Sequence, residues 1–121
     1  MAKRILIADD NKLVRRTLRT LLTEQLGVEV CAEADNGRKA IHSALALRPD
    51  LVILDVRMPE LNGIEVATIL KRCLPELRTI LFTMSSDHIV KGLSADAGVD
   101  VMLPKEVGVS RFIETVGSLL Q

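Results

Sequence analysis

The sequence predicts a three-layer α/β fold, written (βα)5, in which helices cover both faces of a doubly wound parallel sheet. Residues 4–8 and 51–54 are nearly continuous apolar runs, which is typical of strands buried on both faces. Strand-like and helix-periodic segments alternate five times, with short connections. We therefore expect one domain over residues 1–121, with the strand order 2-1-3-4-5.

The first helix is expected between Asn11, which can act as an N-cap, and Gly27, a residue type common just after a last helical turn. Apolar residues recur at helical spacing between these two positions. The basic residues of the segment fall mainly on the opposite face, which we interpret as solvated. These residues are Lys12, Arg15, Arg16 and Arg19.

The later segments follow the same rules. Residues 28–34 and 99–103 alternate between apolar and polar, as edge strands do, whereas residues 78–83 form another strand with an apolar centre. The second helix should place Ala44 and Leu45 on its inner face. The remaining helix boundaries are expected at turn formers, capping residues and the end of an apolar pattern. They are Gly37, Pro49, Gly63, Cys73, Ser85-Ser86-Asp87, Gly98 and Ser110.

Composition excludes several classes of protein. Acidic and basic residues balance at 16 each, so no overall charge favours nucleic acid or a membrane surface. No apolar run reaches the length of a membrane span and no signal-peptide pattern is present, so we expect a soluble, cytoplasmic protein. Cys31 and Cys73 are interpreted as buried thiols, and His42 and His88 as residues of helix surfaces.

Polar residues at the carboxyl ends of the predicted strands form the candidate site. Carboxyl ends of parallel strands meet at one edge, where ligands usually bind. Clustered carboxylates repel one another unless a cation compensates them, and Mg²⁺, which prefers oxygen ligands, is the natural candidate. A nearby ammonium and a hydroxyl could stabilise a phosphoryl group transferred to a carboxylate. The residues are Asp9, Asp10, Asp55, Thr83 and Lys105.

With these residues in this order, the whole chain resembles the receiver domain of two-component response regulators, which has a flavodoxin-like fold. The pattern also includes the motif Leu54-Asp55-Val56-Arg57-Met58-Pro59, and its specificity lies in the ordered set rather than in any single motif. In having Arg57 and the pair Lys105-Glu106, the chain resembles the receivers that are joined to helix-turn-helix output domains.

The resemblance implies a role for each candidate residue. Asp55 would accept a phosphoryl group from a histidine kinase or phosphotransfer protein, while Thr83 and Lys105 would contact that group. Phosphorylation would shift the conformation of the face formed by the fourth helix, fifth strand and fifth helix. The implied Mg²⁺ ligands are Asp9 (through water), Asp10, Asp55 and the backbone carbonyl of Arg57.

The resemblance also implies partners. The domain would control an output domain or partner protein, with transcriptional regulation as the expected outcome, without direct contact to nucleic acid or membrane. Formation of a homodimer and a DNA-binding output domain outside this chain are two further possibilities. Three positions depart from the common pattern of the family: Met84 where a small residue is usual, Met102 where an aromatic residue is frequent, and Glu106 where proline often follows the lysine.

Two alternatives to a phosphorylation-controlled switch are open. A Mg²⁺-dependent phosphohydrolase would generally carry a second acid two residues after its nucleophile, and Arg57 occupies that position, so no separate enzyme activity is expected. A receiver-like interaction domain that acts without phosphorylation is the second alternative, for which Met84 and Met102 leave room.

Overall fold

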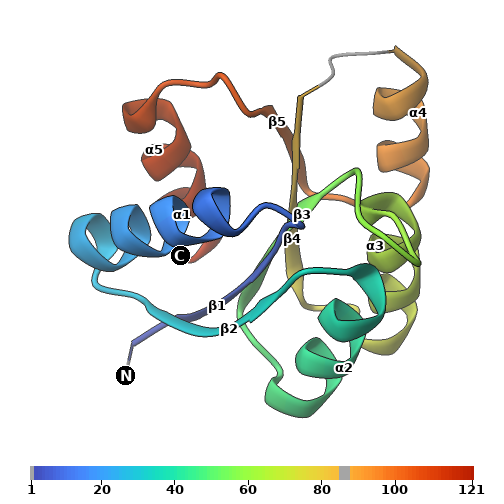
Figure 1. Ribbon diagram of the computed structural model, residues 1–121, viewed down its shortest axis with the longest axis horizontal. Helices are drawn as coiled ribbons and strands as arrows, with labels where there is room; N and C mark the ends of the chain where they lie inside the picture. The colour runs from blue at the N-terminus through green and yellow to red at the C-terminus, as the bar shows by residue number, and fades with distance from the viewer. Residues whose placement is uncertain (1, 85–87) are drawn as a thin grey trace.

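A five-stranded parallel sheet with the order β2-β1-β3-β4-β5 forms the centre of the computed structural model, which describes residues 2–84 and 88–121 (Figure 1). The predicted strand order is therefore confirmed. The strands are β1 (Arg4–Ala8), β2 (Glu29–Ala34), β3 (Leu51–Asp55), β4 (Arg78–Thr83) and β5 (Val101–Pro104). The helices are α1 (Lys12–Leu26), α2 (Gly37–Leu47), α3 (Gly63–Cys73), α4 (His88–Asp96) and α5 (Val109–Leu119).

The helices form two layers, with α1 and α5 on one face of the sheet and α2, α3 and α4 on the other (Figure 1). Alternate residues of each central strand enter opposite layers because side chains of a strand point to alternate faces. Ile53, for example, packs on the α1 and α5 side, whereas Leu54 packs on the other. All five residues of β3 are buried, which explains its unbroken apolar sequence up to Asp55.

Most helix ends match the predicted capping residues. The Asn11 side chain accepts the amide hydrogens of Leu13 and Val14, and Gly27 ends α1 with a φ of 63°. Helix α5 differs from the prediction, because its N-cap is Gly108 rather than Ser110 and no side chain bonds there. The predicted cap at residues 85–87 lies outside the described residues.

Two side chains that were expected to be buried are exposed. Leu45 is 42% exposed on α2, although its neighbour Ala44 is buried. Cys73, the last residue of α3, is exposed, whereas Cys31 is partly buried. His42 lies on the surface as predicted, and the side chain of His88 is outside the described part of the chain.

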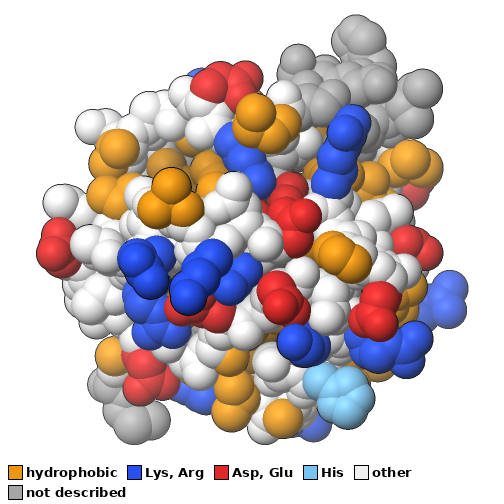
Figure 2. Space-filling view, in the orientation of Figure 1, with side chains coloured by type: hydrophobic (Ala, Val, Ile, Leu, Met, Phe, Trp, Pro, Cys, Tyr) orange, Lys and Arg blue, Asp and Glu red, His pale blue; other side chains and the backbone are white. Residues whose placement is uncertain are grey.

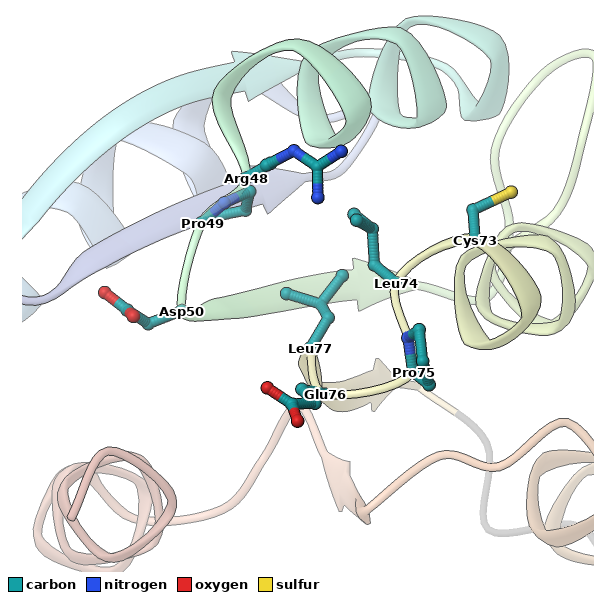
Figure 3. A pocket seen from close by; sticks show the side chains of 8 residues that line it. All are labelled: Arg48, Pro49, Asp50, Cys73, Leu74, Pro75, Glu76 and Leu77. Atoms are coloured by element: carbon teal, nitrogen blue, oxygen red, sulfur yellow. The ribbon is translucent and has the colours of Figure 1, made fainter.

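The Cys73 side chain borders a cavity of about 430 Å³ at the amino-terminal edge of the sheet (Figure 3). The cavity lies between the segment before β3 and the segment before β4, with Arg48 and Leu74 among its lining residues. It is therefore at the opposite end of β3 from Asp55. On the face seen in Figure 2, acidic and basic side chains lie beside one another, as the balanced composition predicts.

Candidate functional site

The strand register places the predicted residues at one edge of the sheet. Ala8 pairs with Leu54, so the residues that follow, Asp9 and Asp55, leave neighbouring strands at the same level. Thr83 pairs with Pro104 at the ends of β4 and β5, and Lys105 comes next in the chain. The backbone amide of Lys105 also donates to the Thr83 carbonyl at 2.7 Å. Parallel pairing thus brings four separate segments to one place.

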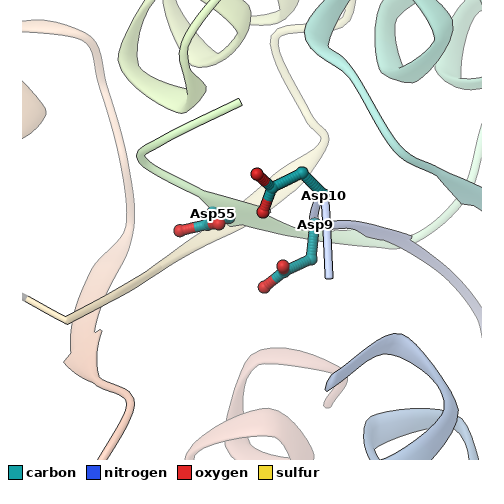
Figure 4. A group of neighbouring side chains, drawn as sticks. All are labelled: Asp9, Asp10 and Asp55. Carbon is teal, nitrogen blue, oxygen red and sulfur yellow. The ribbon is translucent and has the colours of Figure 1, made fainter. Parts of the chain in front are cut away.

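Three carboxylates form the centre of this place (Figure 4). One oxygen from each of Asp9, Asp10 and Asp55 lies within 4.8 Å of the others. Asp9 and Asp55 are buried, whereas Asp10 is exposed. The cluster opens into a cavity of about 580 Å³ that Thr83, Arg57 and Met84 also line.

The Lys105 ammonium bridges the two buried carboxylates. Its Nζ lies 2.8 Å from Asp9 Oδ2 and 3.3 Å from Asp55 Oδ2, and its side chain is only 14% exposed. Burial alone would lower the pKa of Lys105, but the contacts with Asp9 and Asp55 outweigh burial and raise it. Lys105 therefore stays charged and partly neutralises the cluster.

The negative charge of Asp55 remains unfavourably placed. Burial, followed by the negative charge of Asp9, raises the pKa of Asp55 despite the opposing effect of Lys105. The amide of Arg57 is a distant donor to Asp55 Oδ1, at 3.4 Å. A further cation beside Asp55 would therefore lower the energy of the site.

The donor set fits Mg²⁺. Carboxylate oxygens are hard ligands, and the exposed Asp10 leaves room for the water molecules and phosphate oxygens that Mg²⁺ usually retains. No histidine or cysteine belongs to this group of described residues, which disfavours zinc. The role of the Arg57 carbonyl and the water-mediated role of Asp9 stay predictions.

The structure shows the surroundings of the three positions that depart from the family pattern. Met84 lines the cavity, and it is 76% exposed. Met102 lies near the Ser94 hydroxyl, whose Oγ is 4.0 Å from its Sδ. The Lys105–Glu106 peptide bond is trans, since the described chain contains no cis peptide bond.

One contact of the site was not predicted. The sequence pattern predicts that Arg15 lies on a solvated helix face, but in the structure its Nη1 donates to the backbone carbonyl of Asp9 at 2.7 Å. The only hint in the sequence is the acidic residue Glu33, which lies 18 residues further along and also contacts Arg15.

Comparison with known proteins gives consistent matches. The family described as Response regulator receiver domain matches residues 5–117. A protein-glutamate methylesterase/protein-glutamine glutaminase of Alkalilimnicola ehrlichii is 35% identical over 122 residues, which cover 100% of this chain and 30% of that protein. Response regulator protein VraR of Staphylococcus epidermidis is 31% identical over 96% of this chain and 56% of its own length.

The fold is found in solved structures as well. The signal receiver domain of the putative response regulator NarL from Mycobacterium tuberculosis superposes with a TM-score of 0.93 and 25% identity, covering 98% of this chain and 96% of that one. The chain thus spans about half or less of the two curated relatives but nearly all of this isolated domain.

Proposed function

The chain belongs to the response regulator receiver domain family, and from this premise we propose that Asp55 accepts a phosphoryl group from a histidine kinase or phosphotransfer protein. The observation that carries the proposal is the position of Asp55, a buried carboxylate 3.3 Å from the Lys105 ammonium at the base of the acidic cavity. A carboxylate in these surroundings is oriented, accessible and next to a positive charge.

In the proposed reaction, an Asp55 oxygen attacks the phosphorus of a phosphohistidine whose other ring nitrogen carries a proton, the P–N bond breaks, and the donor leaves as a neutral imidazole. The product is an acyl phosphate. Lys105 would pair with the phosphoryl oxygens, and the Thr83 hydroxyl would donate a hydrogen bond to them. Thr83 is 2% exposed and lines the same cavity, which supports this role.

Asp9, Asp10, Asp55 and the Arg57 carbonyl would hold Mg²⁺. When bound, the ion supplies positive charge that offsets both the carboxylates and the phosphoryl oxygens. The residues of the chain supply orientation: the Asp9 side chain accepts the Asn11 amide at 2.8 Å and the Lys105 ammonium at 2.8 Å, so its direction is fixed.

The phosphorylated domain would act as a conformational switch for an output domain or partner protein, in transcriptional regulation, rather than as an enzyme with its own substrate. The response would involve the face formed by α4, β5 and α5. Met102 on β5 occupies the position where many receivers carry an aromatic residue, and its side chain is partly buried against the α4 layer. Because the chain covers 56% of VraR, an output domain and a homodimer remain proposals, as does a cytoplasmic location.

No described helix has both the length and the apolar character needed to span a membrane.

The proposal is tested by intact mass after incubation with Mg²⁺ and acetyl phosphate. We expect a gain of one phosphoryl group, and no gain when Mg²⁺ is chelated. Absence of the gain at any Mg²⁺ concentration would instead favour an interaction domain that works without phosphorylation.

Replacing Lys105 by Met should separate metal binding from signalling. The ammonium occupies Asp9 Oδ2 and Asp55 Oδ2, so its loss should tighten Mg²⁺ binding by about fivefold, as expected from roughly 1 kcal/mol of charge competition in a partly solvated site. Amide shifts of β5 and α5 on phosphorylation should largely disappear, because the phosphoryl group loses its partner. Calorimetry and ¹H–¹⁵N spectra measure the two effects.

Lys71 provides the control, since its Nζ donates to the Pro75 carbonyl at 3.4 Å, at the other end of the sheet from the acidic cluster. Lys71→Met should change neither quantity. A full spectral response in Lys105→Met would contradict the role given to Lys105.

A further inference from the structure

The basic face of α1 contains one arginine that is not solvated. The Arg15 side chain is 14% exposed, whereas that of Arg19, one turn later, is 45% exposed. Long charged side chains are rarely buried unless they are paired. The contacts of Arg15 therefore need an explanation beyond solubility.

Glu33 on β2 holds the Arg15 guanidinium from one side. Its two carboxylate oxygens separately accept Arg15 Nε at 3.1 Å and Arg19 Nε at 2.6 Å. Burial works to raise the pKa of Glu33, but the hydrogen bonds and charges of Arg19 and Arg15 outweigh it and lower the pKa. Glu33 is thus ionised at neutral pH, and it fixes the plane of the Arg15 guanidinium.

The other end of the same guanidinium reaches the main chain of the acidic site. Arg15 Nη1 donates to the Asp9 carbonyl at 2.7 Å, just beyond the last residue of β1. The Asp9 amide donates to the Ala34 carbonyl at 3.0 Å, so the peptide groups on both sides of Asp9 are held. With Asn11 and Lys105 bound to its carboxylate, every polar group of Asp9 has a partner.

We propose that Arg15 is a positioning residue of this site: clamped by Glu33, it fixes the Asp9 carbonyl and with it the directions of the Asp9 and Asp10 side chains. The inference rests on the proposed function, because it assigns Arg15 to the cation site described there. Asp9 and Asp10 are adjacent in the chain and their side chains point to different sides (Figure 4), so a shift of the backbone at Asp9 would misplace both carboxylates.

Electrostatics alone predicts the opposite effect. Removing a positive charge beside an acidic cluster should strengthen cation binding. If Arg15 acts by position, Arg15→Met should instead weaken Mg²⁺ binding, by about tenfold, as loss of a residue that orients metal ligands commonly does. Arg15→Lys keeps the charge but lacks the planar fork, so it should also weaken binding, whereas electrostatics predicts no change.

Arg4 offers a closely matched control at the other end of the sheet. Its Nε contacts Glu29 at 3.2 Å and its Nη1 donates to the Leu47 carbonyl at 2.6 Å, the same arrangement of an arginine, a β2 glutamate and a backbone carbonyl. Arg4→Met should lower stability about as much as Arg15→Met does and leave Mg²⁺ affinity unchanged.

The experiment is a calorimetric Mg²⁺ titration of the parent, Arg15→Met, Arg15→Lys and Arg4→Met, together with amide hydrogen exchange without metal. In the Arg15 variants alone, the Asn11 amide, which donates to Asp9 Oδ1, should exchange about tenfold faster, since its acceptor is no longer held. This readout does not depend on Mg²⁺ or on phosphorylation.

The outcomes distinguish failure of the positioning role from failure of the proposed function. Parent-like Mg²⁺ affinity and Asn11 exchange in both Arg15 variants, or tighter binding in Arg15→Met, would overturn the positioning role and leave the proposed function intact. Failure of the parent itself to bind Mg²⁺ at the acidic cluster would overturn the proposed function and the inference together. Weaker binding in the Arg15 variants but not in Arg4→Met would support both.

Discussion

Replacing Asp55 by Asn is expected to abolish phosphorylation and, at the same time, to stabilise the metal-free protein. The substitution removes the nucleophile, so the mass gain from acetyl phosphate should fall below detection, at least a hundredfold. It also removes a charge that burial and Asp9 make unfavourable. Relief of one partly screened repulsion at the 4.8 Å spacing of the cluster should raise the free energy of unfolding by roughly 1 kcal/mol.

The stabilisation should depend on pH with a definite sign. Because the pKa of Asp55 is raised by folding, the folded protein binds a proton more tightly than the unfolded chain does. Parent stability therefore falls as pH rises from the unfolded pKa of an aspartate through the folded pKa of Asp55. The free energy of unfolding of Asp55→Asn should thus exceed that of the parent at neutral pH. This difference in stability should shrink as pH falls through this window. Urea unfolding at several pH values measures it.

Asp100→Asn is a control with the opposite expected sign. The Asp100 carboxylate accepts the Thr79 amide at 2.8 Å and contacts Arg78, at the other end of the sheet. Its replacement should reduce stability by about 1 kcal/mol and leave phosphorylation unchanged. Phosphate uptake by Asp55→Asn at the parent rate would show that another residue is the acceptor.

The site could be predicted from sequence because its residues follow strands. Apolar runs define where β1, β3 and β4 end, and the parallel arrangement then places Asp9, Asp55 and Thr83 at one edge. The strand order followed from which segments alternate, since edge strands have a less buried face. These inferences need only local patterns and one topological rule.

Contacts between distant segments could not be predicted in this way. The polar face of α1 is visible in the sequence, but only the packing of α1 beside β2 shows that Arg15 meets Glu33 there. The burial of Ala44 but not Leu45 depends on how far α2 is rotated over the sheet. Likewise, Cys73 is the last residue of an apolar pattern, but its side chain is exposed at the end of α3, beside a cavity.

The loop from β3 to α3 leaves no room for a side chain at Gly63. A Cβ atom on Gly63 would overlap the carbonyl oxygen of Asp55 and lie 2.9 Å from the carbonyl carbon of Asp55. The Gly63 amide also donates to the Val56 carbonyl at 2.9 Å, so α3 starts in direct contact with the end of β3. Gly37 is equally close to the same loop, because a Cβ atom there would overlap the Leu61 carbonyl oxygen.

Gly63→Ala should therefore destabilise the protein by about 3 kcal/mol, because backbone atoms cannot rotate away as a side chain can. Either the start of α3 or the end of β3 must move, and the second movement displaces Asp55. Phosphorylation by acetyl phosphate should slow by about tenfold even under conditions where the variant is fully folded, since small misplacements of a reacting group are costly. Urea unfolding and intact mass measure the two effects.

Gly92→Ala makes the same chemical change in α4, where no described residue beyond the chain neighbours and the helix's own nearby backbone lies within 4 Å of the new atom. Alanine is the better helix former by up to about 1 kcal/mol, so this control should be more stable than the parent and equally reactive. If Gly63→Ala behaved like Gly92→Ala, the β3–α3 junction would be able to accommodate the added Cβ atom. The position of Asp55 would then not depend on the close contact at Gly63. If Gly63→Ala lowers the stability and Gly92→Ala raises it, the nucleophile is held by the close contact between the end of β3 and the start of α3. Only glycine permits this contact.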